Sequence, residues 1–212
     1  MSSTTSVPWP FAYPSISAGS RSHGPSGYSD YPPYKDWLRD EFSFRCIYCL
    51  TRERWERDPR SAFGADHVIP RSVDSSLVAE YDNLVYACNT CNSARQDSPL
   101  PIDLNTDPIG RHVRLNAMGE YDGVTPHGRS LIDLLSLNLS PLVEARRRVL
   151  FAYKRVTGAA PGVEGVDFDL FRFPLDLPDL GSLRPPNGNS KPGGIAACAF
   201  NRRATGALAD FY

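Results

Sequence analysis

Cys46-Ile-Tyr-Cys49 and Cys88-Asn-Thr-Cys91 are the two stretches that decide the fold of this chain. Each places two thiols in one turn, and 38 residues separate the pairs. Four thiolates in two such knuckles can hold a tetrahedral zinc ion. Disulfides, unrelated thiols and an iron–sulfur cluster are the alternatives. Because cysteine is otherwise scarce, with only Cys198 left over, the pattern favours a structural zinc in a reducing compartment.

Polar residues suited to metal and proton chemistry stand between and beside the two pairs. Asp66 and His67 come just before Pro70, where a short apolar stretch ends. Asn83 lies ahead of the second cysteine pair, and Asn92 follows it directly. If one metal ion binds the cysteines, it draws these separated residues toward one another.

This pattern resembles the HNH endonuclease family, in the variant that keeps cysteine knuckles around the site. The resemblance covers about residues 42–98 and rests on four motifs: Cys46-Ile-Tyr-Cys49, Asp66-His67-Val-Ile-Pro70, Asn83-Leu-Val-Tyr-Ala-Cys88 and Asn89-Thr-Cys91-Asn92. It implies a ββα-metal fold and metal-dependent hydrolysis of DNA, with RNA not excluded.

The resemblance also implies a role for each matched residue. Asp66 would be a ligand of the catalytic divalent ion, and His67 the general base that deprotonates the attacking water. Asn83 would hold the loop and orient the His67 ring. Asn92 would be the second metal ligand.

Physical chemistry agrees with these roles. Histidine titrates near pH 6.5 and can accept a proton at neutral pH. The oxygen ligands of Asp66 and Asn92 suit Mg²⁺ or Mn²⁺ better than zinc. Arg71 and Arg95 are candidate phosphate contacts, and the alternative is that both are solvated surface arginines.

Composition limits how the chain can capture a substrate. Its net charge is −1, and residues 34–98 hold nine Lys or Arg against eleven Asp or Glu. This balance argues against tight, indiscriminate coating of DNA. No apolar run is long enough to span a bilayer and the N-terminus is a poor signal peptide, so we expect a cytoplasmic protein.

The chain reads as an α+β protein, with a small zinc-stapled core, a helical C-terminal extension and Pro/Gly-rich arms. The expected parts are a flexible N-terminal arm (1–33), a nuclease domain (34–98), a small strand region plus two helices (99–157) and a Pro/Gly-rich tail without helical periodicity (158–212).

Within the domain, helical spacing predicts a short helix from Tyr34. Residues 62–70 and 83–87 read as strands, and a helix should follow Cys88. The order is therefore strand, loop, strand, helix.

In the extension, strands are expected around residues 113–115. Thr125-Pro126 and Ser140-Pro141 each supply a predicted N-cap followed by proline. The second helix carries Arg146 and four further basic residues, which read as a solvated face that could supply a DNA surface.

This extension resembles the helical segment that follows the nuclease core in some HNH proteins of bacterial anti-phage systems. That resemblance implies an ATPase partner, as in Septu-type defence. Three hypotheses result: a metal-dependent endonuclease, a non-catalytic zinc module that binds nucleic acid or protein, and a nuclease subunit active only with its partner.

Overall fold

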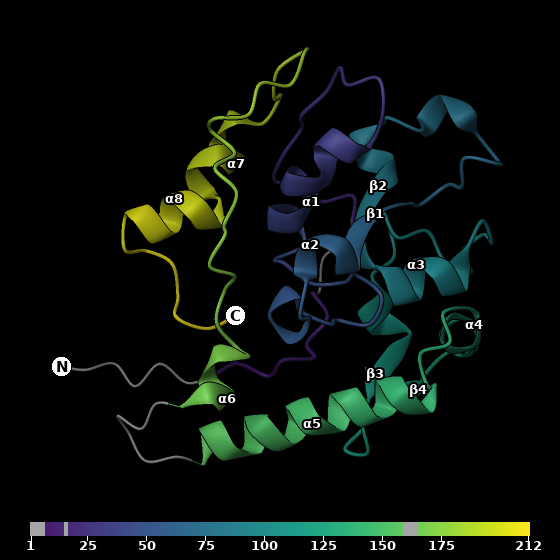
Figure 1. Ribbon diagram of the computed structural model, residues 1–212. Coiled ribbons are helices and arrows are strands. Elements are labelled where there is room, and N and C mark those ends of the chain that lie inside the picture. The colour runs from purple at the N-terminus through teal and green to yellow at the C-terminus, as the bar shows by residue number, and fades with distance from the viewer. Residues whose placement is uncertain (1–6, 15–16, 159–164) are drawn as a thin grey trace.

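The computed structural model describes residues 7–14, 17–158 and 165–212 of the chain (Figure 1). The expectations for residues 1–6 and 15–16 of the arm and for residues 159–164 of the tail lie outside the described residues.

A two-stranded antiparallel hairpin forms the centre of the predicted nuclease core. β1 (Phe63–His67) pairs with β2 (Leu84–Cys88), with Phe63 opposite Cys88 and His67 opposite Leu84. α3 (Asn89–Arg95) begins directly where β2 ends. The predicted order of strand, loop, strand and helix is confirmed, and so is the α+β class.

The first cysteine knuckle packs against this hairpin. α1 (Lys35–Glu41) precedes it and buries Trp37 and Leu38 completely, as their spacing predicts. The backbone N–H of Ile47 donates to the Tyr86 carbonyl at 2.9 Å and fixes the knuckle beside β2. α2 (Pro59–Ala62) then leads into β1.

Short 3₁₀ turns connect these elements and lie where the chain changes direction. They are η1 (Pro32–Tyr34), η2 (Glu53–Trp55), η3 (Ser75–Leu77), η4 (Tyr81–Asn83) and η5 (Ile109–Arg111).

The extension consists of a second small hairpin and two helices. β3 (Val113–Leu115) pairs with β4 (Tyr121–Gly123), and α4 (Pro126–Leu134) and α5 (Ser140–Thr157) follow. The predicted Thr125 cap is confirmed, because its Oγ1 accepts the N–H of Gly128 at 3.0 Å. The predicted Ser140 cap is wrong. Ser140 already has helical backbone, and Leu139, at the cap position, makes no side-chain bond.

α5 is less uniformly basic at its surface than its sequence indicates. Arg146 is buried, and its guanidinium donates to the carbonyl oxygens of Gly119 at 2.7 Å and Leu137 at 2.6 Å. The expectation that Arg146 belongs to a solvated face is therefore wrong. Its charge instead holds the second hairpin and the α4–α5 connection against the helix.

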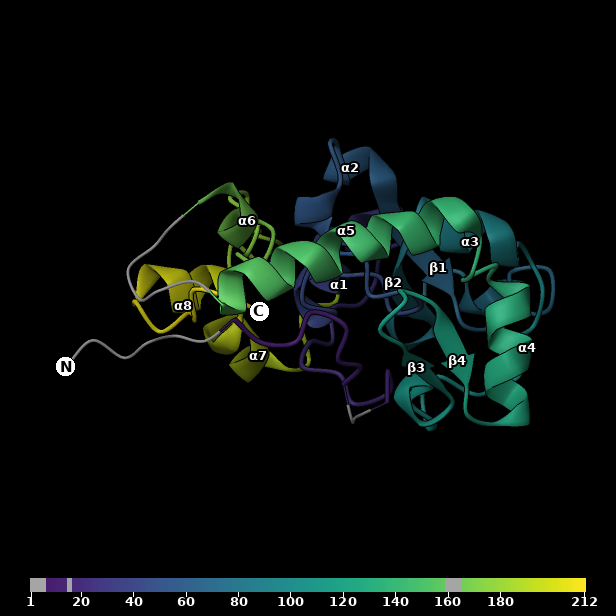
Figure 2. The ribbon, with the colours of Figure 1, turned by 90° about the horizontal axis from the view of Figure 1, so that it is seen from below.

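Three short helices occupy the described part of the tail, where no helix was expected: α6 (Val166–Asp169), α7 (Pro192–Ala197) and α8 (Ala199–Ala204). None is long enough to show two turns of helical periodicity. In Figures 1 and 2, α7 and α8 lie on one side of the hairpin and α3 and α4 on the other, while α5 runs along the molecule between α4 and α6.

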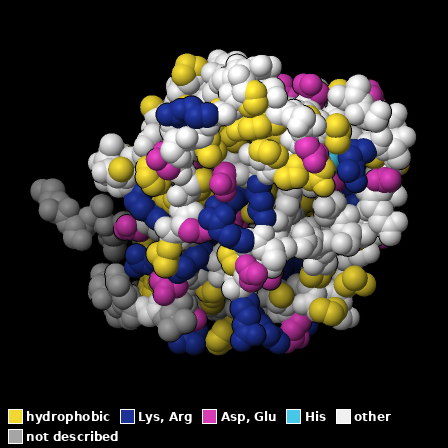
Figure 3. Space-filling model, turned by 45° about the horizontal axis from the view of Figure 1, so that its top comes forward, with side chains coloured by type: hydrophobic (Ala, Val, Ile, Leu, Met, Phe, Trp, Pro, Cys, Tyr) yellow, Lys and Arg dark blue, Asp and Glu magenta, His cyan; other side chains and the backbone are white. Residues whose placement is uncertain are grey.

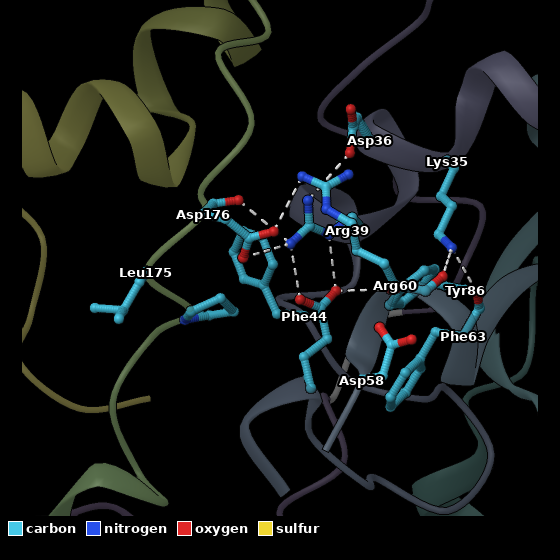
Figure 4. A network of polar contacts seen from close by, with 12 residues as sticks. Lys35, Asp36, Arg39, Phe44, Asp58, Arg60, Phe63, Tyr86, Leu175 and Asp176 are labelled. Carbon is cyan, nitrogen blue, oxygen red and sulfur yellow. Dashed lines mark hydrogen bonds and ion pairs between the residues drawn. The ribbon is translucent and has the colours of Figure 1, made fainter. Parts of the chain in front are cut away.

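A buried ion-pair network connects the tail to the core (Figure 4). Arg39 on α1 pairs with buried Glu53 at 2.9 Å and with Asp176 of the tail at 3.1 Å. The Tyr86 hydroxyl donates to Glu53 at 2.7 Å. Because the buried carboxylate has several donors, its desolvation is offset. Within the described ranges, no helix is both long and apolar enough to cross a membrane.

Candidate active site

The sulfur atoms of the two cysteine pairs meet in the interior. All four lie within 4.8 Å of one another, and the Cys49 and Cys88 Sγ atoms are 3.6 Å apart. Tetrahedral zinc with sulfur at about 2.3 Å places its ligand sulfurs about 3.8 Å from each other, so the cluster fits this ion. All five cysteines are free, which excludes the disulfide alternative here. Burial raises the pKa of the Cys46 thiol, so a bound cation would offset the cost of its buried thiolate.

Tyr48 links this cysteine cluster to the polar residues of the site. It lies between Cys46 and Cys49 and is fully buried. Its hydroxyl donates to Asp66 Oδ2 at 2.6 Å. Sequence reasoning missed this residue, although its place inside a knuckle is a usable signal. A metal that fixes the knuckle therefore also fixes a hydrogen bond to Asp66.

Asp66 is buried near the end of β1, and protein donors hold both of its oxygens. Oδ1 accepts the His67 backbone N–H at 2.8 Å, and Oδ2 accepts from Tyr48 and from Arg95 at 2.8 Å. A carboxylate offers about four acceptor positions. Donors within the described ranges use three of them, which leaves one position on Oδ1, and Asp66 lines a hollow.

His67 follows at the end of β1 with its ring largely buried. Nε2 lies 3.1 Å from the Val78 carbonyl oxygen. A carbonyl can only accept, so Nε2 carries the proton and Nδ1 keeps its lone pair. No group in the described ranges hydrogen-bonds Nδ1, and it is not among the buried polar atoms left without a partner. Burial lowers the pKa of His67, more than its bond to Val78 raises it, which favours the neutral ring.

Asn83 fixes the loop that connects the two strands. Its Oδ1 accepts the Ile69 N–H at 2.8 Å, and its Nδ2 donates to the carbonyl oxygens of Ile69 at 3.1 Å and Leu77 at 3.2 Å. The loop in turn supplies the Val78 carbonyl to the ring of His67. Asn83 therefore reaches His67 through the loop backbone, without touching the ring.

A polar hollow of about 140 Å³ brings most of the expected residues together. We call it the active-site hollow. It is lined by Tyr31, Ala65, Asp66, His67, Pro70, Arg71, Asn92, Gln96 and Asp97. Tyr31, Gln96 and Asp97 were not expected. Tyr31 comes from the N-terminal arm, where sequence spacing gives no signal for it. Gln96 and Asp97 directly follow α3, which carries Asn92, and the chain bends there, so helical spacing from Asn92 gives no signal for them.

The two candidate phosphate contacts lie in different surroundings. Arg71 is exposed, lines the hollow, and has its guanidinium carbon 5.6 Å from the centre of the Tyr31 ring. Arg95 is buried and donates to Asp66, Tyr48 and backbone carbonyls, so its positive charge interacts with groups in the protein interior. This placement matches neither a phosphate contact nor a solvated arginine.

The comparisons with known proteins agree with this geometry. Residues 46–98 match the family model described as HNH endonuclease, so this segment is similar to an HNH endonuclease domain. The match covers both cysteine pairs and every expected site residue, and it supports a nuclease of the HNH type. No curated protein and no solved structure matches the chain.

Charges of both signs are mixed on one face of the molecule. On the face shown in Figure 3, lysine and arginine side chains are interspersed with aspartate and glutamate and do not form one continuous basic patch. This agrees with the net charge of −1. That face offers no broad electrostatic footprint for nucleic acid.

Proposed function

We propose that the chain is a metal-dependent endonuclease that hydrolyses phosphodiester bonds of DNA. The observation that carries this proposal is the active-site hollow, because Asp66, His67 and Asn92 all line it. A purely structural zinc module has no need of a base, two oxygen donors and an arginine around one polar hollow.

His67 is the general base in this proposal. Its Nε2–H is anchored on the Val78 carbonyl, so the lone pair of Nδ1 is available to a water molecule in the hollow. The neutral ring accepts the proton of that water as it attacks phosphorus. The lowered pKa keeps the ring unprotonated at neutral pH.

The remaining position on Asp66 and the amide oxygen of Asn92 would hold the divalent cation. Mg²⁺ and Mn²⁺ prefer such oxygen ligands. When bound, the cation supplies stabilisation of negative charge on the phosphate and on the leaving oxygen. Arg71, exposed at the edge of the hollow, adds a positive charge that can contact a phosphate oxygen.

Tyr48, Asn83 and Arg95 position the groups that react. Tyr48 and Arg95 hold the Asp66 carboxylate from the buried side. Asn83 holds the loop that carries Val78. Such fixed geometry matters because a misplacement of about 1 Å can cost roughly a hundredfold in rate.

The test is cleavage of plasmid DNA by wild-type protein and by His67→Ala, with Mg²⁺, with Mn²⁺ or with a chelator. Wild type should cut in the presence of either ion, and His67→Ala should lose roughly a hundredfold or more of the rate. Zinc content and the unfolding midpoint should not change. His127→Ala, an exposed histidine on α4, is the matched control and should cut like wild type. Undiminished cleavage by His67→Ala would refute the assignment.

A nuclease that depends on a partner is the second candidate. The mixed charge on the face shown in Figure 3 and the net charge of −1 favour it, because that face gives the isolated chain no broad basic surface for substrate capture. An ATPase subunit and a role in anti-phage defence are the forms of this proposal that the resemblance of the extension suggests. Gene neighbourhood and plaque counts in cells carrying wild type or His67→Ala test both. Equal plaque counts for the two would reject the defence role.

A further inference from the structure

The N-terminal arm lies directly beside the active-site hollow. Arg21 is buried and donates to the Leu84 carbonyl of β2. His23 is buried with its Nε2 2.9 Å from Asp40 on α1. Gly24 accepts the Ser190 N–H of the tail at 2.9 Å. Three separate parts of the molecule therefore hold the arm in place ahead of Tyr31.

Tyr31 is the arm residue that enters the site. Its ring centre is 5.0 Å from that of His67, with an angle of 79° between the ring planes. The Arg71 guanidinium lies over the same tyrosine ring at 5.6 Å. Tyr31 thus touches the proposed base and the proposed phosphate contact at once. It lies outside the segment that matches the HNH family model.

His67 needs a second contact to have one orientation. The one ring hydrogen bond that His67 makes to the described part of the chain, from Nε2 to the Val78 carbonyl, fixes one point of the imidazole. The last torsion of a histidine side chain is broad, so the ring plane is not determined by that bond alone. The edge-to-face contact with the Tyr31 ring supplies the missing restraint.

We propose that Tyr31 is a positioning residue, whose ring fixes the plane of His67 and the direction of Arg71 at the wall of the active-site hollow. This rests on the proposed function. The N-terminal arm is thereby part of the working nuclease, although the family segment contains the reacting groups. Tyr31 acts through packing, so its ring matters and its hydroxyl does not.

The experiment compares Tyr31→Ala, Tyr31→Phe and Tyr28→Ala in the full-length, zinc-loaded protein. Tyr28 is the matched control, because it belongs to the same arm but packs edge-to-face on Tyr34 at 4.9 Å. Cleavage of a DNA oligonucleotide gives kcat and KM separately. Proton NMR of the four histidine rings reports on the local field at His67.

Tyr31→Ala should lower kcat roughly tenfold to a hundredfold with KM within about twofold. Tyr31→Phe should restore wild-type kcat. The His67 ring resonances should move in Tyr31→Ala and stay in place in Tyr28→Ala. Tyr31→Leu keeps an apolar side chain of similar bulk and should also lower kcat. It serves as a second variant in case Tyr31→Ala does not fold.

If Tyr31→Ala kept the wild-type kcat and His67→Ala were inactive, the proposed function would stand and the proposal for Tyr31 would be overturned. Equal losses in Tyr31→Phe and Tyr31→Ala would overturn it too, since the hydroxyl would then carry the effect. If Tyr28→Ala lowered kcat as much as Tyr31→Ala, the proposal would also be overturned, because the effect would then come from packing of the arm in general. Full activity of His67→Ala is a different outcome, because it rejects the proposed function itself.

Discussion

Arg95 shows how a single buried residue organises the site. Its guanidinium reaches Asp66, the hydroxyl of Tyr48 and the carbonyl oxygens of His67 and Val68. These groups belong to β1, to the first cysteine knuckle and to the loop after β1. The planar fork of arginine suits such a set, because several donors are fixed relative to one another.

We expect Arg95→Met to lower the free energy of unfolding by about 3–5 kcal/mol, since it leaves the buried Asp66 carboxylate without the guanidinium that pairs with it. Arg95→Lys should lose less, because it keeps the charge but cannot bridge the same acceptors. Urea unfolding of zinc-loaded protein measures both. If Arg95→Met proved as stable as wild type, the buried pair would not support the site.

At the scale of elements, α3 ends in a strained residue beside the hollow. Gln96 follows the helix with φ +53° and ψ −131°, a region that glycine occupies more easily than other residues. Strain of this kind costs roughly 1–3 kcal/mol and recurs at functional sites. The bend sets Gln96 and Asp97 at the wall of the hollow, instead of continuing the helix.

Gln96→Gly should raise the free energy of unfolding by about 1 kcal/mol. Glycine relieves the backbone strain, and part of this gain is offset because glycine loses more conformational entropy on folding. Gln96→Ala should give no gain, because alanine has the same steric conflict. Thermal unfolding of the two variants separates these outcomes. A destabilised Gln96→Gly would show that contacts of the glutamine side chain outweigh the backbone strain.

At the scale of the whole molecule, the cysteine cluster joins segments that are far apart in sequence. It lies within the main core, with Tyr48, Phe63 and Tyr86 around it. Both hairpins depend on it, because the Tyr121 hydroxyl of β4 donates to the Cys49 carbonyl at 2.8 Å. Metal binding at such a site contributes directly to folding.

We expect one zinc ion per chain, and loss of the cooperative unfolding transition when a strong chelator removes it. Cys91→Ala should not retain zinc. Cys198→Ala is the control, because Cys198 is also buried but lies outside the cluster, and it should keep the full metal content. Elemental analysis and calorimetry measure these quantities. Stoichiometric zinc in Cys91→Ala would place the metal elsewhere.

Local sequence determined the core of this protein. The spacing of four cysteines, the apolar runs on each side of Asp66 and Asn83, and the Thr125 cap all act over a few residues, so each could be recognised in the sequence. The resemblance of the four motifs to the HNH family identified His67 and Asn92, which the structure brings to one hollow.

Only the tertiary structure decided the surroundings of that core. The burial of Arg95 and Arg146, the approach of Tyr31 to His67 and the docking of the tail through Asp176 are contacts between distant segments. Such contacts leave no periodic trace, because they depend on how the elements pack rather than on the neighbours of each residue. The short tail helices were not predicted from the sequence for a related reason. Packing stabilises them, because their few residues have too little helix propensity of their own.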